Sequence, residues 1–416
     1  MRKLFYNPHL IIQVSNTKQK YLRYPGKNFS EPLSGYSIVT ENGIISEIIQ
    51  TVQINKNEYS EIIDLTGKIL LPGLIESHTH IPFAGSRASE FRERLSGVSY
   101  EEITKRGGGI NTTVKATRAC SEQDLTAIVK SRIDDFIKQG VTTLELKSGY
   151  GLDYESELKI LNVINNIKKT CNITLIPTFL GAHLVPFDFK NRREEYIKLI
   201  CEKMLPDFVG LNLISFCDIF IEKEAFTIEE SERIFCVAKK LNLRVKSHSN
   251  QFHSIGGIDV SLRFDATSVD HLEVLTEHEI NQLANSETCC TILPGVSYTL
   301  DYTYAPARKL LDLGGIVALA TDFNPGTSHI KNIPFIFSLA AVKLKMTINE
   351  IIAGYTLNAA YALGLSDITG SIEPGKNADF AIFDSDDAGS LIYNTTENLN
   401  VMTIKNGIII YSFDKR

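Results

Sequence analysis

Hydrophobic residues in the middle of the chain alternate between two patterns. Short apolar runs, typical of buried strands, are followed by longer stretches in which apolar residues recur every three or four positions, the spacing of one helix face. Eight strand-like runs lie between about residues 69 and 322: 69–75, 142–146, 174–178, 214–221, 243–246, 266–270, 290–293 and 316–320. Eight alternations of strand and helix predict a (β/α)₈ TIM barrel.

The stretch 121–139 illustrates the helical pattern. Ser121 is placed to cap a helix start, Leu125, Val129 and Ile133 fall on one face, and Gly140 follows as a stop signal. A doubly wound sheet is the rival fold. It would call for a G-x-G-x-x-G loop after the first strand, whereas the glycines at 107–109 come far too late.

Both ends of the chain carry a different pattern, with short strands joined by turns. Asn42-Gly43 and Asn406-Gly407 are hairpin signals between strand-like runs. The runs are 10–14, 36–40 and 43–49 near the start, and 380–383, 401–405 and 408–411 near the end. We therefore predict one small β-sandwich domain composed of residues 1–63 and 372–416, and a barrel domain of residues 64–371.

Composition narrows the functional classes. The 416 residues carry a formal charge of -6, with 43 Lys and Arg against 49 Asp and Glu, and no basic run, so nucleic acid is not an expected partner. The longest apolar stretches are strand-sized and no secretion signal opens the chain, which favours a cytoplasmic protein without a membrane partner. Seven cysteines include no C-x-x-C pair, and we assign them no function.

Metal-binding side chains follow four of the predicted strands. His78 and His80 come at the end of the first strand, and residues two apart on a strand point the same way. His248 ends the fifth strand, His271 the sixth and Asp322 the eighth. In a TIM barrel these strand ends meet at the face where active sites lie, so the residues can surround one ion.

The order of these residues resembles the amidohydrolase superfamily, and the segment 370–379 is similar to that superfamily's return into its small β domain. Other segments resemble the imidazolonepropionase family within it, over roughly residues 60 to 385. They are GSRASEF at 85–91, GGGI at 107–110, KSGYG at 147–151, GAH at 181–183 and TDFNPGT at 321–327. This resemblance implies a hydrolase of histidine degradation that opens the ring of 4-imidazolone-5-propanoate to give N-formimidoyl-L-glutamate.

The resemblance also implies roles for the strand-end residues. His78, His80, His248 and Asp322 would hold one divalent or trivalent metal ion per subunit, Zn or Fe, since imidazole and carboxylate ligands suit both. Asp322 would in addition carry the proton from water to the leaving nitrogen, and His271 would hydrogen-bond the oxyanion. Lys223 falls beyond the fourth strand, where binuclear relatives have a bridging lysine, which favours a single metal.

Substrate contacts follow from the same resemblance. Arg87 would bind the carboxylate tail of the substrate through two parallel hydrogen bonds from its planar guanidinium group. The other residues implied in binding are Tyr100, Tyr150, His183, Gln251, Asn324, Gly326 and Thr327. For Tyr100 packing in a helix is an alternative, and for Gly326 a simple turn.

One position departs from part of the family. Some members carry a glutamate three residues after the fifth-strand histidine, where this chain has Gln251. An amide can hold substrate but cannot shuttle a proton, so Gln251 is either a substitute in catalysis or only a substrate contact. Three alternatives stay open: another cyclic-amide hydrolase, an aminohydrolase of the same superfamily, and a scaffold barrel without activity. Relatives are commonly dimers, so we expect a homodimer.

Overall fold

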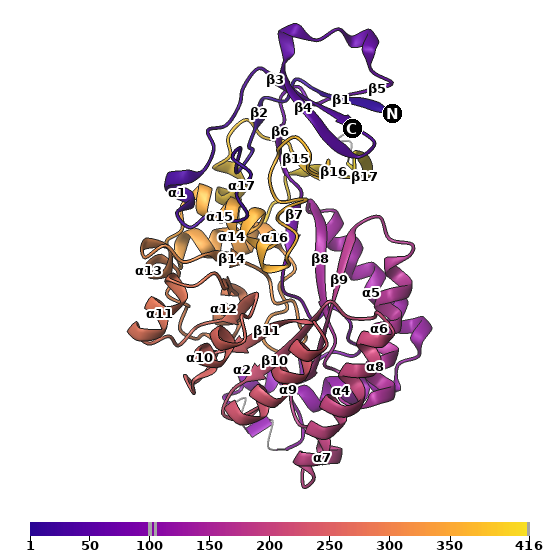
Figure 1. Cartoon of the computed structure of the whole chain (residues 1–416), viewed down its shortest axis with the longest axis vertical. Helices are drawn as coiled ribbons and strands as arrows, with labels where there is room; N and C mark the ends of the chain where they lie inside the picture. The colour runs from indigo at the N-terminus through magenta and orange to yellow at the C-terminus, as the bar shows by residue number, and fades with distance from the viewer. Residues whose placement is uncertain (99–101, 104–105, 414–416) are drawn as a thin grey trace.

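Eight parallel strands form the central sheet of the molecule, in which every strand pairs with its neighbours along the sequence (Figure 1). The computed structural model describes residues 1–98, 102–103 and 106–413. The strands are β7 (Leu74–Glu76), β8 (Val141–Lys147), β9 (Thr174–Ala182), β10 (Phe216–Ile221), β11 (Arg244–Ser249), β12 (Ser268–His271), β13 (Cys289–Ile292) and β14 (Val317–Leu319). The barrel prediction is confirmed, because each predicted run overlaps one of these strands.

The first predicted strand was wrong in its extent. The run 69–75 is divided at Gly73 into β6 (Ile69–Pro72), which belongs to a different sheet, and the barrel strand β7. A side chain at Gly73 would lie 2.3 Å from Thr142, so the backbone passes too close to β8 for any other residue. The Gly73 N–H donates to the carbonyl of Asp379 and that of Leu74 to Gly140, so the chain changes sheets at this glycine.

The barrel closes where its first and last strands meet. Thr79 and Phe323 form a single parallel bridge, and two backbone bonds flank it, from Asp322 N–H to the His78 carbonyl at 3.2 Å and from His80 N–H to the Phe323 carbonyl at 3.0 Å. The seam therefore lies between the residues that were expected to bind a metal.

Glu76 strengthens this seam from within the barrel. Its carboxylate accepts hydrogen bonds from the Thr321 N–H at 3.0 Å and from the Tyr355 hydroxyl at 2.8 Å. The side chain is fully buried, and burial raises its pKa to about 8 despite these bonds.

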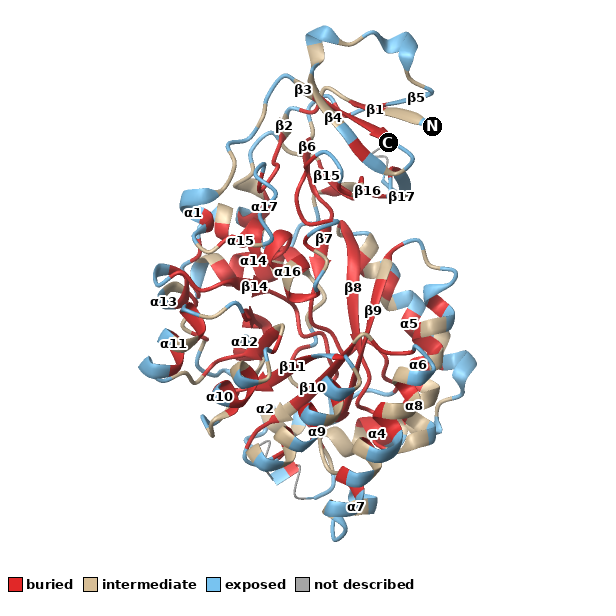
Figure 2. Ribbon diagram, in the orientation of Figure 1, coloured by how far each residue is buried: buried red, intermediate tan, exposed pale blue. Residues whose placement is uncertain are grey.

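Helices surround the barrel, with exposed outer faces and buried inner faces (Figure 2). In α5 the Ser121 hydroxyl accepts from the Asp124 N–H, Leu125 and Phe136 are buried, and Gly140 follows with φ 93°. The helices of the barrel region are α2 (Ala88–Leu95), α4 (Ile110–Ala119), α5 (Glu122–Ile137), α6 (Tyr154–Lys168), α7 (Arg193–Lys198), α8 (Leu205–Gly210), α9 (Ile228–Lys240), α10 (Gly257–Arg263), α11 (Glu277–Ala284), α12 (Pro294–Leu300), α13 (Ala307–Asp312), α14 (Ile333–Val342), α15 (Ile348–Gly354) and α16 (Leu357–Ala362). Short elements are α1 (Pro25–Asn28), α17 (Ser390–Tyr393), η1 (Thr51–Gln53), η2 (Lys56–Glu58), η3 (Phe187–Phe189) and η4 (Leu199–Met204).

Two further sheets are built from the chain ends, which lie at one end of the molecule in Figure 1. One has the order β4-β3-β1-β5 and the other β17-β16-β15-β6-β2. Phe5 of the first packs edge-on against Phe380 of the second, with ring centroids 5.1 Å apart, so the sheets share a core. Their strands are β1 (Arg2–Tyr6), β2 (Leu10–Ile11), β3 (Tyr36–Glu41), β4 (Ile44–Gln50), β5 (Glu61–Asp64), β6, β15 (Phe380–Phe383), β16 (Asn400–Lys405) and β17 (Ile408–Ser412). The exact domain division at residues 63 and 372 stays a prediction.

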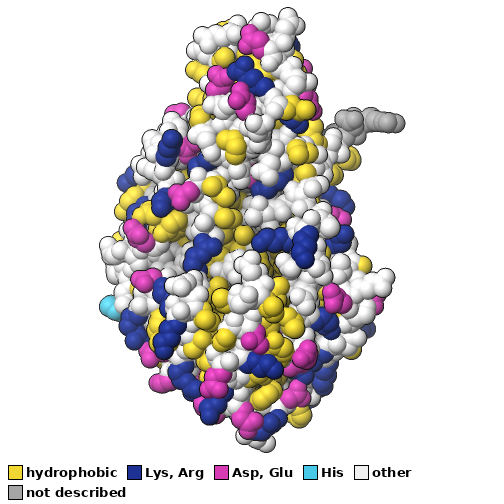
Figure 3. Space-filling view, turned by 45° about the vertical axis from the view of Figure 1, so that its right-hand side comes forward, with side chains coloured by type: hydrophobic (Ala, Val, Ile, Leu, Met, Phe, Trp, Pro, Cys, Tyr) yellow, Lys and Arg dark blue, Asp and Glu magenta, His cyan; other side chains and the backbone are white. Residues whose placement is uncertain are grey.

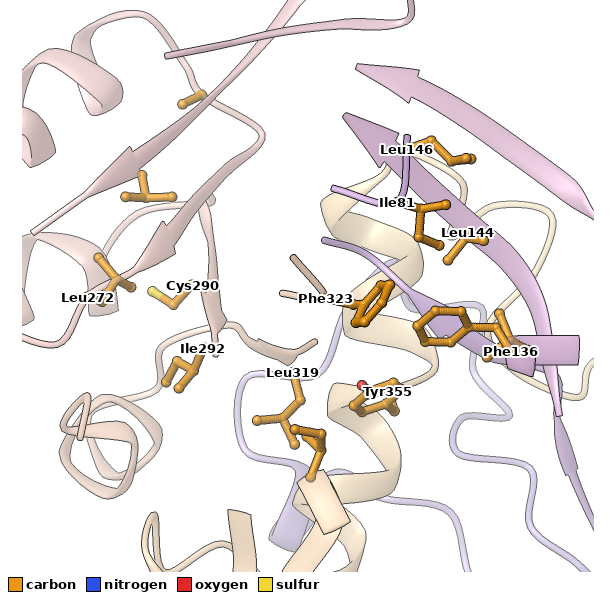
Figure 4. Close-up of a cluster of buried hydrophobic side chains, with 14 of the residues drawn as sticks. Ile81, Phe136, Leu144, Leu146, Leu272, Cys290, Ile292, Leu319, Phe323 and Tyr355 are labelled. Atoms are coloured by element: carbon orange, nitrogen blue, oxygen red, sulfur yellow. The ribbon is translucent and has the colours of Figure 1, made fainter. Parts of the chain in front are cut away.

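The hydrophobic core also anchors the last barrel strand. Figure 4 shows Phe323 beside Phe136, near Ile81 and Leu144, and the centroids of the two phenylalanine rings are 6.4 Å apart. Because Phe323 directly follows Asp322, this packing holds the aspartate in place.

Acidic and basic side chains are mixed over the face in Figure 3, where hydrophobic side chains gather along the middle. Among the described residues, none of the helices combines the length and the apolar character needed to cross a bilayer.

Candidate metal centre

Four side chains converge at the carboxyl ends of β7, β11 and β14. Nε2 of His80 lies 3.3 Å from Nε2 of His78, 3.3 Å from Nε2 of His248 and 3.2 Å from Oδ1 of Asp322. Oδ1 of Asp322 is also 3.2 Å from Nε2 of His78. Four ligands about 2.0–2.1 Å from a tetrahedral ion would be separated by about 3.3–3.4 Å, so the spacing fits a first-row metal.

The chemistry of Asp322 supports the same interpretation. Its Oδ1 is buried and accepts no hydrogen bond from any described residue, although two imidazole nitrogens lie 3.2 Å away. Acceptor atoms that face one another with no hydrogen between them can together bind one cation. Burial would raise the pKa of Asp322, but His78 and His80 outweigh burial and hold it well below the usual value, so the carboxyl is ionised.

Carboxylates behind two of the histidines fix which nitrogen faces the centre. His78 Nδ1–H donates to Asp270 Oδ2 at 2.6 Å, and His248 Nδ1–H donates to Asp218 Oδ1 at 3.1 Å. With Nδ1 engaged, Nε2 presents its lone pair to the site, which is the usual arrangement around metal-binding histidines.

A buried layer of charge lies beneath these carboxylates and was missed by sequence reasoning. Lys147 Nζ lies 2.7 Å from Asp218 and 2.8 Å from Glu145, and Lys246 Nζ lies 3.0 Å from Glu145 and 3.5 Å from Asp270. All five side chains have no exposed surface. Burial opposes the charged form of Lys147, yet Asp218 and Glu145 raise its pKa.

The signal for this layer was present in the strand periodicity. Glu145 and Lys147 are two apart on β8, and Lys246 precedes His248 by two on β11, so each pair points to one face. Charged side chains at alternate positions of a buried strand need charged partners inside the barrel, which the same strand or other strands supply.

His271 joins this group from the end of β12. One of its ring nitrogens lies within 4.8 Å of ring nitrogens of His78 and His248. Burial would lower the pKa of His271, but Glu273 and the carboxylates of Asp322 and Asp270 outweigh it and raise the pKa. The structure thus brings together all five strand-end residues that the sequence singled out.

Arg87 lies at the start of α2 and is almost fully buried. Its Nε–H donates to Glu90 Oε2 at 2.7 Å, and Glu90 in turn accepts from Thr112 and Gly109. The guanidinium passes over Gly326, where an added Cβ would lie 2.1 Å from Nη1. Gly326 is therefore required for a close approach, which the turn interpretation alone does not explain.

The loop after β14 connects Arg87 to the residues of the candidate metal centre. Asn324 Nδ2–H donates to Asp322 Oδ2 at 2.9 Å, which leaves Oδ1 of Asp322 for the histidines. The Asn324 Oδ1 accepts from the N–H groups of Gly326 and Thr327 at 2.8 and 2.7 Å. One asparagine thus orients both the aspartate and the backbone beneath Arg87.

Tyr150 and His183 lie beside the ring of His80. The His183 ring stacks on His80 with centroids 5.3 Å apart, and the Tyr150 ring lies 5.9 Å from His80. Burial, assisted by His80, lowers the pKa of His183 to about 3, so the ring is neutral. Its Nδ1–H donates to the Gly149 carbonyl at 3.0 Å, and Nε2 is left as an acceptor.

The remaining positions that the sequence singled out are Gln251, Tyr100 and Lys223. Gln251 is buried in the loop directly after β11. Tyr100 lies outside the described residues. β10 ends at Ile221, so Lys223 is not part of the barrel strand.

Comparisons with known proteins agree with this geometry. Residues 69–410 match the model of the amidohydrolase family. The chain is 42% identical to an imidazolonepropionase of Clostridium tetani over 90% of both chains, and 39% identical to one of Acinetobacter baumannii over 98% of this chain and 99% of that one. A zinc-bound adenosine deaminase of Xanthomonas campestris, 16% identical, superposes with a TM-score of 0.73 over 100% of this chain and 94% of the other, which indicates a shared fold.

Proposed function

Because this chain belongs to the amidohydrolase family, and within it to the imidazolonepropionases, we propose that it opens the ring of 4-imidazolone-5-propanoate with water. The product would be N-formimidoyl-L-glutamate, in the degradation of histidine. The observation that carries this proposal is the convergence of three imidazole nitrogens and one carboxylate oxygen at 3.2–3.3 Å.

His78, His80, His248 and Asp322 would hold one metal ion per subunit, Zn or Fe. Charge favours a divalent ion, since among the described residues Glu145, Asp218 and Asp270 pair with the two ammonium groups of Lys147 and Lys246, and Asp322 adds a fourth carboxylate beside His78 and His80. The two negative charges left over would be costly in a buried site without a cation. A bound ion of this kind acidifies water and polarises a carbonyl oxygen.

Proton transfer would rest on Asp322. Its depressed pKa keeps it ionised at neutral pH, so it can accept a proton from the attacking water. Water oxygen then bonds to the ring carbonyl carbon, the bond from that carbon to the ring nitrogen breaks, and the nitrogen takes the proton from Asp322. His271 would donate a hydrogen bond to the oxyanion that develops during this step.

Arg87 would bind the propionate tail, because its planar guanidinium can hold a carboxylate with two parallel hydrogen bonds and Glu90 fixes its position through Nε. The loop 322–327 links tail binding by Arg87 to proton transfer by Asp322, since it contacts Arg87 at Gly326 and orients Asp322 through Asn324. The other proposed substrate contacts are Tyr100, Tyr150, His183, Gln251, Asn324, Gly326 and Thr327.

The test uses purified full-length protein with its metal content measured. We expect about one metal ion per chain and loss of the imidazolone absorbance, with formimidoylglutamate as the product. A folded, metal-loaded protein that leaves the imidazolone unchanged but hydrolyses another cyclic amide would overturn the assignment.

We also propose that the protein is a homodimer and lies in the cytoplasm. Light scattering of the same sample tests the homodimer.

A further inference from the structure

The turn after β12 has an unusual backbone. His271 and Leu272 have φ angles of 86° and 73°, a region that residues with side chains rarely occupy, and here two follow each other. Backbone bonds from Leu272 N–H to the Ser249 carbonyl at 3.2 Å and from Val274 N–H to the Asn250 carbonyl at 2.9 Å keep the turn against β11. Such strain persists only where the surroundings impose it, and it concentrates at functional sites.

This turn brings the side chain of Glu273 back onto His271. Oε1 of Glu273 lies 3.3 Å from Nδ1 of His271, and the two side chains are 1% and 3% exposed. The second oxygen, Oε2, is buried and has no hydrogen-bond partner among the described residues. Within the described part of the chain the carboxylate is thus directed at one imidazole, and it is not part of a wider polar network.

The same arrangement recurs at two neighbouring histidines. Asp270 and Asp218 accept from Nδ1 of His78 and His248, and thereby turn Nε2 of each ring toward the centre. Glu273 stands in the corresponding place behind His271. A carboxylate can only accept, so the His271 Nδ1–H is the donor and Nε2 is the nitrogen left for the substrate.

We propose that Glu273 is a positioning residue for His271, which holds the ring so that Nε2–H meets the carbonyl oxygen of the substrate. The proposal rests on the function proposed above. A ring that donates from both nitrogens carries a positive charge, and the adjacent carboxylate balances that charge in a buried site. Gln251 cannot do this, because its amide is uncharged.

A double-mutant cycle tests the proposal in the full-length, metal-loaded protein. Glu273→Leu removes the acceptor, and we expect kcat on the imidazolone to fall about 100-fold with KM almost unchanged, the size of effect typical of groups that orient a catalytic or metal-binding histidine. Glu273→Gln keeps an acceptor oxygen and should lose about tenfold. In a His271→Ala background, Glu273→Leu should cost at most about twofold more, because groups acting as a unit are not additive.

Two controls separate positioning from loss of structure. Glu350 on α15 is also a buried carboxylate with a cationic partner, Arg308 at 2.8 Å, so Glu350→Gln should lower stability without lowering kcat. Metal content should stay at the parental value in every variant. Where Glu273→Leu fails to fold, Glu273→Gln in the parental and His271→Ala backgrounds completes the cycle.

A second readout does not depend on turnover. The hydrogen-bonded Nδ1 proton of His271 should give a downfield proton NMR signal that disappears in both Glu273→Leu and His271→Ala. Parental kcat in a folded Glu273→Leu variant, or equal losses in both backgrounds, would overturn the proposal. An inactive parent that still shows the signal would instead count against the proposed function and leave the Glu273–His271 contact established.

Discussion

Gly326→Ala is the sharpest perturbation of substrate binding that the structure offers. The added methyl would lie 2.1 Å from Nη1 and 2.9 Å from Cζ of Arg87, whereas ordinary contact begins at about 3.4 Å. Arg87 would therefore have to move by about 1.3 Å. It cannot simply swing away, because Glu90 holds Nε at 2.7 Å within a buried cluster. A displacement of about 1 Å in a positioning group can cost on the order of 100-fold in rate.

The assay compares two substrates. We expect kcat/KM on the propionate-bearing imidazolone to fall about 100-fold, mostly through KM, and the value on an imidazolone without the carboxylate to change little. Gly210→Ala is the matched control, since no atom lies within 4 Å of the added methyl and Gly210 is an exposed residue at the end of α8. Equal losses on both substrates, with reduced metal content, would show that the loop moves in place of Arg87 and would refute the reasoning.

Four further outcomes follow from the site. His248→Ala should lower bound metal and activity together, as measured by metal analysis, and normal occupancy would remove it from the ligand set. Arg87→Lys keeps the charge but loses the fork, so kcat/KM should fall on the carboxylate substrate only. Asp322→Asn should abolish the chemical step, with partial rescue by Gln251→Glu in that background; near-parental turnover would place the base elsewhere. In metal-free protein, stability from Glu76 should be full below pH 4.5 and lost as pH rises through about 8, so Glu76→Gln should flatten that decline in Tm.

Strand ends were predictable from the sequence because each buried strand is a local pattern. His78, His248 and Asp322 each lie at the end of a predicted strand, and a barrel brings all such ends to one face. The division at Gly73 was not predictable in the same way. Apolar residues flank Pro72-Gly73 on both sides, so residues 69–75 were predicted as one strand although this pair is typical of turns. The close approach of Gly73 to Thr142 marks the division in the structure.

The carboxylates that contact His78 and His248 could not be inferred from the sequence, because these contacts depend on strand register. Asp218 on β10 contacts His248 on the neighbouring strand β11. The register of these strands pairs His248 with Phe220, so Asp218 lies two residues away from the position directly opposite His248. Lys147 meets Asp218 from β8 although β9 lies between these strands in the sheet. Only the curvature of the closed barrel brings such positions into contact, and no local sequence pattern encodes that curvature.

The orientation of Asp322 and His271 depends on positive φ angles, which residues other than glycine rarely adopt. Asp322 has φ 50° and His271 has φ 86°, and neither is a glycine. Each such residue costs on the order of 1–3 kcal/mol, so the surroundings must impose the conformation. At Asp322 the burial of Phe323 and the Asn324 hydrogen bonds do so, and at His271 the bonds to β11 do so. The residues that orient Asp322 and His271 therefore lie two positions after them in the chain, namely Asn324 and Glu273.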